Sequence, residues 1–280
     1  MTDGPKIMIA GPHGFVGSRA MEHWKNAVPV PGELVRQPGE ALADFVKKHC
    51  PDVILNGAAI SDIGTCEKNP EDSYRANVTL PVVLAGATAS VGAKLLSFSS
   101  DQVYTGCRDE GPYAERDSLP EPANVYARHK LEAEERVLDI LPEAVMLRAT
   151  WMYDMPVYGA ANRGNFLVNT MRALLRGEAL CCSSLEYRGI TYVRQVAALL
   201  DQAAALPGGV YNYGSENPLS MLETAEALFA ALGVAGTVTD MEKRRHNLWM
   251  DCGKLQRCGI VFDTTAEGFR RCVRDYGLQW

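Results

Sequence analysis

A glycine-rich turn near the N-terminus constrains the fold of this chain more than any other feature. Residues 6–10 (KIMIA) form an apolar run typical of a buried strand, and residues 15–26 are predicted to be a helix. Gly11, Gly14 and Gly17 join the two with the spacing G-x-x-G-x-x-G. One glycine permits the sharp turn, another lets backbone amides approach a pyrophosphate, and a third lets helix and strand pack closely. We predict a dinucleotide cradle at the helix N-terminus.

The first half of the chain alternates short apolar runs with amphipathic stretches. This alternation is typical of βαβ units and predicts an α/β fold, a Rossmann-type doubly wound parallel sheet. The expected strands after the first are residues 27–30, 52–55, 94–99 and 144–148. The expected helices are residues 40–49, 78–91 and 123–138.

The second half is less regular. We predict helices over residues 165–176, 193–204 and 220–232 and a strand over residues 209–213. Ser-x-x-Glu and Thr-x-x-Glu capping boxes mark two helix starts, at Ser220 with Glu223 and at Thr264 with Glu267. We assign residues 1–150 to a dinucleotide-binding domain to which roughly residues 190–215 return. A smaller, interleaved C-terminal substrate-binding lobe then comprises residues 151–189 and 216–280.

Composition excludes several other classes of protein. The net charge is −6 and the basic residues are scattered, which disfavours a nucleic-acid partner. The longest apolar runs end within about ten residues, too short to span a membrane. The chain enters its first strand without room for a signal peptide, and its eight cysteines form no C-x-x-C pair. We therefore expect a cytoplasmic protein with reduced thiols and no structural zinc.

A tyrosine and a lysine lie one helical turn apart on the predicted helix over residues 123–138. Tyr126 and Lys130 share one face of that helix. A free phenol has a pKa of about 10, and a nearby cation is expected to lower the pKa of Tyr126. Tyr126 can then exchange a proton with a carbonyl or alcohol oxygen. A Y-x-x-x-K match arises by chance in roughly a third of shuffled sequences of this length. The neighbouring segments must therefore decide whether this match marks a catalytic site.

Those surroundings point to the carboxyl edge of one sheet, where α/β folds bind ligands. Ser100 ends the strand over residues 94–99 and can hydrogen-bond the reacting oxygen. We predict Ser100, Tyr126 and Lys130 as the catalytic residues. Asn56-Gly57-Ala58-Ala59 ends a neighbouring strand, and Asn77 is expected to open the helix behind it. The predicted cofactor-binding residues are Gly11, His13, Gly14, Phe15, Val16, Gly17, Arg36, Asn56, Gly57, Ala58, Ala59, Asn77, Ser99, Tyr126 and Lys130.

The choice of cofactor depends on the residues after the second strand. An acidic side chain there would bind the ribose 2′-hydroxyl of NADH, whereas an arginine would suit the 2′-phosphate of NADPH. Glu33 and Arg36 are both present. Arg36, together with Arg19, favours NADPH, and NADH stays open.

Taken together, these motifs resemble the extended short-chain dehydrogenases/reductases and, among them, the dTDP-4-dehydrorhamnose reductase family. The resemblance covers nearly the whole chain. It includes the segments PDVILN at 51–56, LRATWMY at 147–153, GNF at 164–166 and RRHN at 244–247. It implies hydride delivery from NAD(P)H to the 4-keto carbon of a nucleotide-activated deoxysugar, a step of dTDP-rhamnose biosynthesis. The implied substrate-binding residues are Ser100, Asp101, Gln102, Trp151 and Asn165.

Departures from the family pattern leave alternatives open. Arg19 stands where relatives can carry a glutamate linked to a metal, so we predict no metal. Leu248 and Arg245 replace a serine and a proline of the C-terminal signature, which puts the substrate in doubt. The alternatives are a reductase of another small carbonyl, a nucleotide-sugar epimerase, or a non-catalytic dinucleotide-binding regulatory subunit. The fold class makes a homodimer the default expectation.

Overall fold

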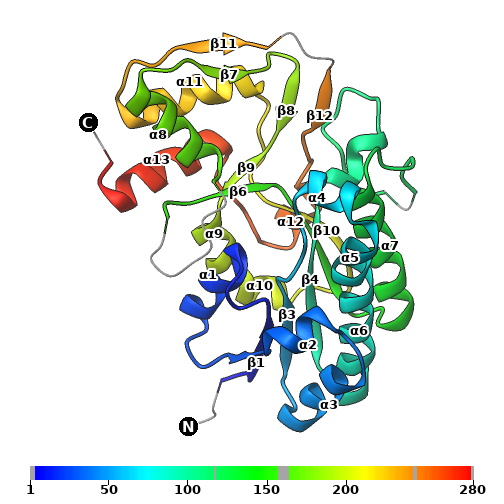
Figure 1. Cartoon of the computed structure of the whole chain (residues 1–280). Coiled ribbons are helices and arrows are strands. Elements are labelled where there is room, and N and C mark those ends of the chain that lie inside the picture. The colour runs from blue at the N-terminus through cyan, green and yellow to red at the C-terminus, as the bar shows by residue number, and fades with distance from the viewer. Residues whose placement is uncertain (1–3, 117, 157–163, 242–244, 279–280) are drawn as a thin grey trace.

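A computed structural model describes residues 4–116, 118–156, 164–241 and 245–278. Its centre is a sheet of six parallel strands in the order β10-β5-β4-β3-β1-β2 (Figure 1). These strands are β1 (Ile7–Ala10), β2 (Val28–Pro29), β3 (Val53–Asn56), β4 (Lys94–Ser100), β5 (Val145–Ala149) and β10 (Gly209–Tyr213). The predicted parallel α/β fold is confirmed.

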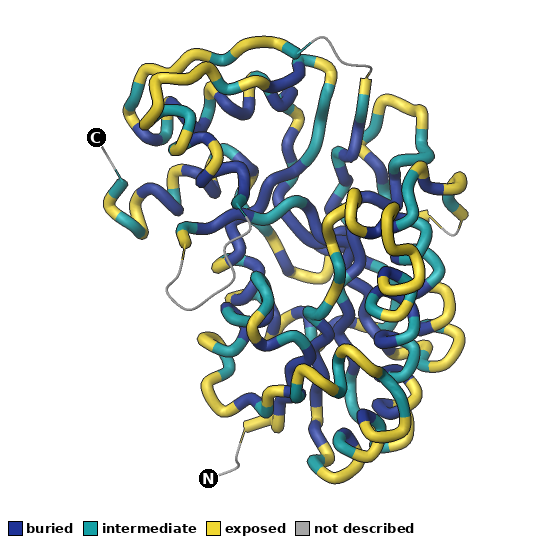
Figure 2. The backbone as a smooth tube through the Cα atoms, viewed as in Figure 1, coloured by how far each residue is buried: buried dark blue, intermediate teal, exposed yellow. Residues whose placement is uncertain are grey.

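The central strands are buried on both faces. Every residue of β1, β3 and β5 is buried, and in Figure 2 the centre of the sheet lies within more exposed helices. Strands covered on both sides are expected to show continuous apolar runs rather than alternation, as the runs IMIA and VIL do.

Helices cover both faces of this sheet (Figure 1). One face packs against α3 (Glu40–His49), α6 (Leu80–Val91) and α7 (Val125–Ile140) through a core that includes Leu42 and Leu84. The other face packs against α1 (Phe15–His23), α9 (Val193–Ala198) and α10 (Leu200–Ala204).

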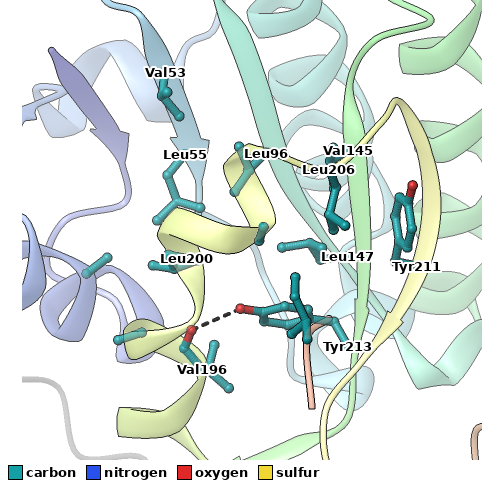
Figure 3. Close-up of a cluster of buried hydrophobic side chains, with 14 of the residues drawn as sticks. Val53, Leu55, Leu96, Val145, Leu147, Val196, Leu200, Leu206, Tyr211 and Tyr213 are labelled. Atoms are coloured by element: carbon teal, nitrogen blue, oxygen red, sulfur yellow. Dashed lines mark hydrogen bonds between the residues drawn. The ribbon is translucent and has the colours of Figure 1, made fainter. Parts of the chain in front are cut away.

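Figure 3 shows the core of the second face, where leucine and valine side chains of β3, β4 and β5 meet those of α9 and α10. Tyr213 of β10 closes this core. Its hydroxyl donates a hydrogen bond of 3.1 Å to the carbonyl oxygen of Val196 (Figure 3). Burying a hydroxyl without a partner costs free energy, so this contact ties β10 to the helix layer.

The remaining elements lie mostly beyond the carboxyl ends of the strands (Figure 1). They include three pairs of short parallel strands: β6 with β9, β7 with β11 and β8 with β12. Helices beside these strands pack on a core of aromatic and aliphatic side chains that is separate from the two cores of the sheet. Their bounds are β6 (Trp151–Tyr153), α8 (Phe166–Arg176), β7 (Leu180–Cys182), β8 (Glu186–Arg188), β9 (Ile190–Tyr192), α11 (Met221–Leu232), β11 (Val238–Asp240), β12 (His246–Leu248) and α13 (Thr265–Tyr276). The smaller C-terminal lobe is confirmed, and its residue boundaries stay a prediction.

Short helical segments connect the larger elements. They are α2 (Gly32–Arg36), α4 (Ile63–Lys68), α5 (Pro70–Tyr74), the π-helical turn Arg75–Thr79, the 3₁₀ turn Asp101–Gly106 and α12 (Gly253–Arg257). Among the described residues, no helix is both long and apolar enough to cross a bilayer.

Several predicted helices differ from the structure. The helix predicted over residues 15–26 ends at His23, and the one predicted over residues 123–138 runs from Val125 to Ile140. The helix predicted over residues 193–204 is two helices, because Leu199 leaves helical geometry with φ −96° and ψ 1°. The helix predicted from residue 78 begins as α6 at Leu80, after the π-helical turn. Both capping boxes, at Ser220 and Thr264, are formed.

The order of the strands opens a crevice beside β1. The chain passes from β1 to β2 on one side and then crosses to β3 on the other side of β1. Connections that leave in opposite directions diverge at the carboxyl ends of β1 and β3, where doubly wound sheets bind ligands. The glycine-rich turn after β1 and the Gly57–Ala58 segment after β3 both lie at this point.

Candidate active site

A cavity of about 1030 Å³ lies at the carboxyl edge of the sheet. The turn after β1, the ends of β3 and β4, one face of α7 and the start of the smaller lobe contribute to its walls. The predicted residues that line it are Gly11, His13, Gly14, Phe15, Val16, Arg36, Gly57, Ala58, Ala59, Ser99, Ser100, Asp101, Gln102, Tyr126, Lys130, Trp151 and Asn165. The structure therefore brings most of the predicted cofactor-binding residues and the predicted catalytic and substrate-binding residues to one cavity.

The glycine-rich turn leaves no room for side chains where it meets the end of β3. Gly11 has a φ of +78°, and a Cβ there would lie 2.8 Å from the backbone of Ala58. Gly14 precedes α1, and no side chain caps the first amides of that helix. Those amides and the positive end of the helix dipole adjoin the cavity, which suits an anion such as a diphosphate.

Three predicted cofactor-binding residues lie behind the cavity wall instead of on it. A Cβ on Gly17 would lie 1.9 Å from the carbonyl oxygen of Gly11, so this glycine serves helix–strand packing. Asn56 donates a 3.0 Å hydrogen bond to Ser97 Oγ and accepts one from the Ala58 amide. Asn77 donates to the carbonyl oxygen of Ile60 at 2.9 Å and lies buried. These residues shape the turns that face the cavity, and direct contact with a cofactor is not expected of them.

The far end of the cavity contains the residues considered for cofactor choice. Arg36 and Val35 line it from the end of α2, and Arg36 is exposed to solvent. Glu33, one turn earlier, does not line it. Arg19 is no candidate for the cofactor, because it is buried in an ion pair of 2.8 Å with Asp154. The positive side chain of Arg36 is therefore a charge at this end that a 2′-phosphate would meet, whereas Arg75, which also lines the cavity, is paired with Asp72 at 2.9 Å.

Tyr126 and Lys130 lie on one face of α7, as their spacing predicts. Asn124 caps this helix by accepting a hydrogen bond from the Ala127 amide at 2.8 Å, which fixes the helix start at Val125, one residue before Tyr126. The Lys130 ammonium donates to the carbonyl oxygen of Phe98 at 2.8 Å and lies 5.8 Å from the centre of the Tyr126 ring. Both side chains are buried and line the cavity.

The environment of Tyr126 differs from the sequence-based expectation. Burial raises the pKa of the Tyr126 phenol, and a hydrogen bond with Ser100 opposes that rise. Burial also lowers the pKa of Lys130 to about 8, with Glu134 opposing. The prediction that the pKa of Tyr126 is lowered is therefore wrong for this arrangement, because burial raises it by more than the Ser100 hydrogen bond and Arg188 lower it. Tyr126 is a neutral phenol near pH 7 and can donate a proton.

Ser100 ends β4 and begins the following 3₁₀ turn. Its Oγ accepts from the Gln102 amide at 3.2 Å and donates to the Asp101 carboxylate at 3.1 Å. Asp101 in turn forms an ion pair of 2.7 Å with Arg188, which is the last residue of β8 in the smaller lobe. A hydrogen-bonded chain thus runs from Arg188 through Asp101 to Ser100, and from there to Tyr126.

Two predicted substrate-binding residues of the smaller lobe, Trp151 and Asn165, line the cavity. Trp151 lines the cavity, and the Arg188 guanidinium carbon lies 5.3 Å from the centre of a Trp151 ring. Asn165 caps α8 by accepting from the Val168 amide at 3.1 Å, while its Nδ2 donates to the carbonyl oxygen of Asp154. Those contacts engage both ends of the Asn165 amide, so we expect this residue mainly to shape the wall.

Several lining residues were not among the site residues predicted from the sequence. They are Ile60, Ser61, Asp62, Ile63, Gly64, Asp72, Arg75, Phe98, Ala149, Thr150, Met152, Gly164 and Arg188. Most of them continue segments already singled out, so the position of a strand end could have found them. Arg188 follows no motif; the sequence offers it only as one of four arginines, with Arg163, Arg244 and Arg245, whose forked side chains suit a diphosphate. Of the others, Arg245 is exposed and paired with Glu110, while Arg163 and Arg244 lie outside the described residues.

Metal ligands do not gather in the described part of the chain. No three His, Cys, Asp or Glu side chains lie there as a metal site would require. Arg19, which stands at the position considered for a metal-linked glutamate, binds Asp154 through Nε and Nη2 at 2.9 and 2.8 Å.

Comparison with known sequences identifies the family. Residues 5–251 match the family described as the RmlD substrate binding domain. A dTDP-4-dehydrorhamnose reductase of Mycobacterium tuberculosis (strain CDC 1551 / Oshkosh) is 32% identical over 81% of this chain and 76% of its own length. A dTDP-4-dehydrorhamnose reductase of Burkholderia thailandensis is 29% identical over 81% of this chain and 78% of its own length.

Solved structures share the fold. A dTDP-4-dehydrorhamnose reductase of Bacillus anthracis, in complex with NADP, superposes with a TM-score of 0.84 at 21% identity, covering 98% of this chain and 99% of that one. A UDP-N-acetylglucosamine 4-epimerase of Methanobrevibacter ruminantium has a TM-score of 0.81 at 16% identity, covering 98% of this chain and 99% of that one. Similarity at these identities supports the fold, and function must be argued from the site.

Proposed function

The chain belongs to the RmlD substrate binding domain family, and we propose that it is an NADPH-dependent reductase of the 4-keto group of a nucleotide-activated deoxysugar. This is the reaction for which its dTDP-4-dehydrorhamnose reductase relatives are named. One observation carries the proposal: Ser100, Tyr126 and Lys130 line the same cavity as the uncapped start of α1. A proton donor and an anion-binding helix end in one space favour a dinucleotide-dependent carbonyl reduction.

Three features of the cavity support binding of a dinucleotide. The closely packed Gly11 and the uncapped amides of α1 suit a pyrophosphate. Arg36 provides a positive charge at the far end, which favours the 2′-phosphate of NADPH over the free hydroxyl of NADH. Lys130 lies beside Tyr126 at the opposite end, where its ammonium can hold the nicotinamide ribose.

The chemistry divides between the cofactor and the side chains. NADPH, when bound, supplies the hydride that reduces the carbonyl carbon. Tyr126, whose phenol is protonated near pH 7, donates its proton to the carbonyl oxygen. Ser100 hydrogen-bonds the same oxygen while negative charge develops on it. The Lys130 ammonium then stabilises the phenolate left on Tyr126. Trp151 and Gln102 line the space beside the trio, where the sugar would lie.

A homodimer and a cytoplasmic location are further parts of this proposal. The homodimer rests on the fold class, and the location on the reduced cysteines expected of a cytosolic enzyme. Light scattering of the purified chain should give the mass of two copies. A single-copy mass at micromolar concentration would contradict the dimer.

The substrate is tested by a screen that follows cofactor absorbance. The purified chain is mixed with NADPH or NADH and either a dTDP-4-keto-6-deoxysugar or a panel of simple ketones. We expect oxidation of NADPH with the sugar nucleotide and none without a carbonyl compound. Turnover of simple ketones alone would replace the proposed substrate. A chain that binds NADPH and reduces no carbonyl would favour the regulatory-subunit alternative.

A further inference from the structure

Arg188 occupies an unusual position for a charged residue of the smaller lobe. Its side chain is 14% exposed, and it reaches across the cavity to Asp101 at the end of β4. The backbone beside it is fixed, because Asn217 donates to the Arg188 carbonyl oxygen at 2.9 Å and a Cβ on Gly189 would lie 2.1 Å from the Ser215 carbonyl oxygen. The backbone of Arg188 is therefore fixed on its own side of the cavity, and its guanidinium carbon lies 5.3 Å from the centre of a Trp151 ring.

Asp101 connects Arg188 to the proposed catalytic residue Ser100. Its carboxylate is buried, with one oxygen bound to Arg188 at 2.7 Å and the other to Ser100 Oγ at 3.1 Å. Ser100 has a single hydroxyl proton. While that proton is donated to Asp101, Ser100 has none to offer to a substrate oxygen.

A buried carboxylate without a counter-charge would hold the Ser100 proton more tightly. It would also oppose the negative charge that Tyr126 takes on when the phenol gives up its proton. Burial is the main cause that raises the pKa of Tyr126, and Asp101 raises it further while Ser100 and Arg188 lower it. Arg188 thus offsets Asp101 at both groups.

We propose that Arg188 is a positioning residue for the reduction: by pairing with Asp101 it frees the Ser100 hydroxyl to turn from Asp101 to the carbonyl oxygen of the substrate. Arg188 acts through Asp101 and Ser100, and it needs no contact with the reacting atoms. The inference rests on the proposed carbonyl reduction and assigns to the smaller lobe a part in the chemistry as well as in binding. The pair also links β8 to the residue that follows β4, so Asp101 gains its counter-charge only when the smaller lobe packs against the sheet edge.

The proposal distinguishes Arg188 from a residue that only binds substrate. An interaction made equally in the ground and transition states changes KM, whereas one that matters in the transition state changes kcat. Loss of a transition-state hydrogen-bond donor lowers kcat by about 10²- to 10³-fold. Because Arg188 acts on Ser100 indirectly, we expect Arg188→Met to lower kcat by about 10²-fold or somewhat less, with an unchanged affinity for NADPH.

Three companion variants separate this role from a structural one. Arg188→Lys keeps the charge but not the planar fork, so kcat should recover in part. The double variant Asp101→Asn with Arg188→Met removes the unbalanced carboxylate. Because the two residues are in contact and neighbours couple strongly, it should be about tenfold faster than Arg188→Met alone. Arg245→Met is the matched control, since it removes an exposed arginine of the same lobe that pairs with Glu110.

The full-length variants are compared by steady-state kinetics, thermal unfolding and NADPH titration, with the carbonyl compound that the wild-type chain reduces. We expect the order of kcat to be wild type and Arg245→Met, then Arg188→Lys, then the double variant, then Arg188→Met. An Arg188→Met kcat within twofold of wild type, a change confined to KM, or a double variant no faster than Arg188→Met would overturn the proposal. Wild-type turnover of a simple ketone alone would contradict only the proposed substrate, and failure to reduce any carbonyl would contradict both.

Discussion

Gly17 is the most severe packing constraint in the cradle, and Gly17→Ala tests it. The added Cβ would lie 1.9 Å from the carbonyl oxygen and 2.8 Å from the carbonyl carbon of Gly11, both backbone atoms that cannot rotate away. A carbon and a carbonyl oxygen ordinarily approach no closer than about 3.3 Å, so α1 must retreat from the turn by about 1.4 Å. That shift moves the helix amides that face the cavity.

Both stability and cofactor affinity should fall. Overpacking costs about 1–3 kcal/mol, which lowers Tm by about 2–4 °C per kcal/mol in a chain of this size. Misplacing reacting groups by about 1 Å costs on the order of 10²-fold in rate, and we expect a loss of NADPH affinity of about that size. The assay is NADPH titration beside a thermal-unfolding scan.

Gly86→Ala is the matched control for this change. Gly86 also lies inside a helix, α6, but a Cβ there meets nothing within 4 Å. Alanine in an unobstructed helix position should therefore stabilise the chain by about 0.5–1 kcal/mol and leave NADPH binding unchanged. If Gly17→Ala bound NADPH as tightly as wild type and melted at the same temperature, the packing argument for the cradle would be refuted.

Three further predictions concern charge. Arg36→Ser should weaken NADPH binding while leaving NADH binding nearly unchanged, as paired titrations would reveal; equal losses for both cofactors would argue against a 2′-phosphate contact. The value of kcat/KM should decline as pH rises through about 8, where Lys130 loses its proton, and a flat profile to pH 10 would contradict that role. Asp154→Ala leaves the buried Arg19 guanidinium without its carboxylate partner and should lower the free energy of unfolding in urea by about 3–5 kcal/mol. Asp44→Ala, which breaks an exposed pair with Lys47, should lower it by under about 1 kcal/mol. Equal losses in the two variants would refute the distinction between buried and exposed pairs.

The sequence predicted the parts of the fold that depend on local pattern. Strands buried on both faces leave continuous apolar runs, so the runs at 6–10 and 52–55 correspond to β1 and β3. The strands of the smaller lobe are three residues long, too short for any period to appear. The break in the helix predicted over 193–204 falls at Leu199, a residue with no intrinsic preference against helix.

In the candidate site, too, the sequence predicted what depends on local spacing and missed what depends on tertiary packing. Spacing along α7 places Tyr126 and Lys130 on one face, but spacing contains no information on burial, which controls the pKa of both groups. Arg188 meets Asp101 across 87 residues of sequence, and only the packing of the smaller lobe against the sheet edge brings them together. Such long-range pairs cannot be predicted from one sequence.

The role of Tyr126 as proton donor is the central claim, and a single hydroxyl deletion tests it directly. Tyr126→Phe should reduce kcat by at least about 10²-fold while the affinity for NADPH stays at the wild-type value. Tyr211→Phe, which removes a hydroxyl bound to the carbonyl oxygen of Pro207 away from the cavity, should keep wild-type kcat. Turnover by Tyr126→Phe at the wild-type rate would contradict the account.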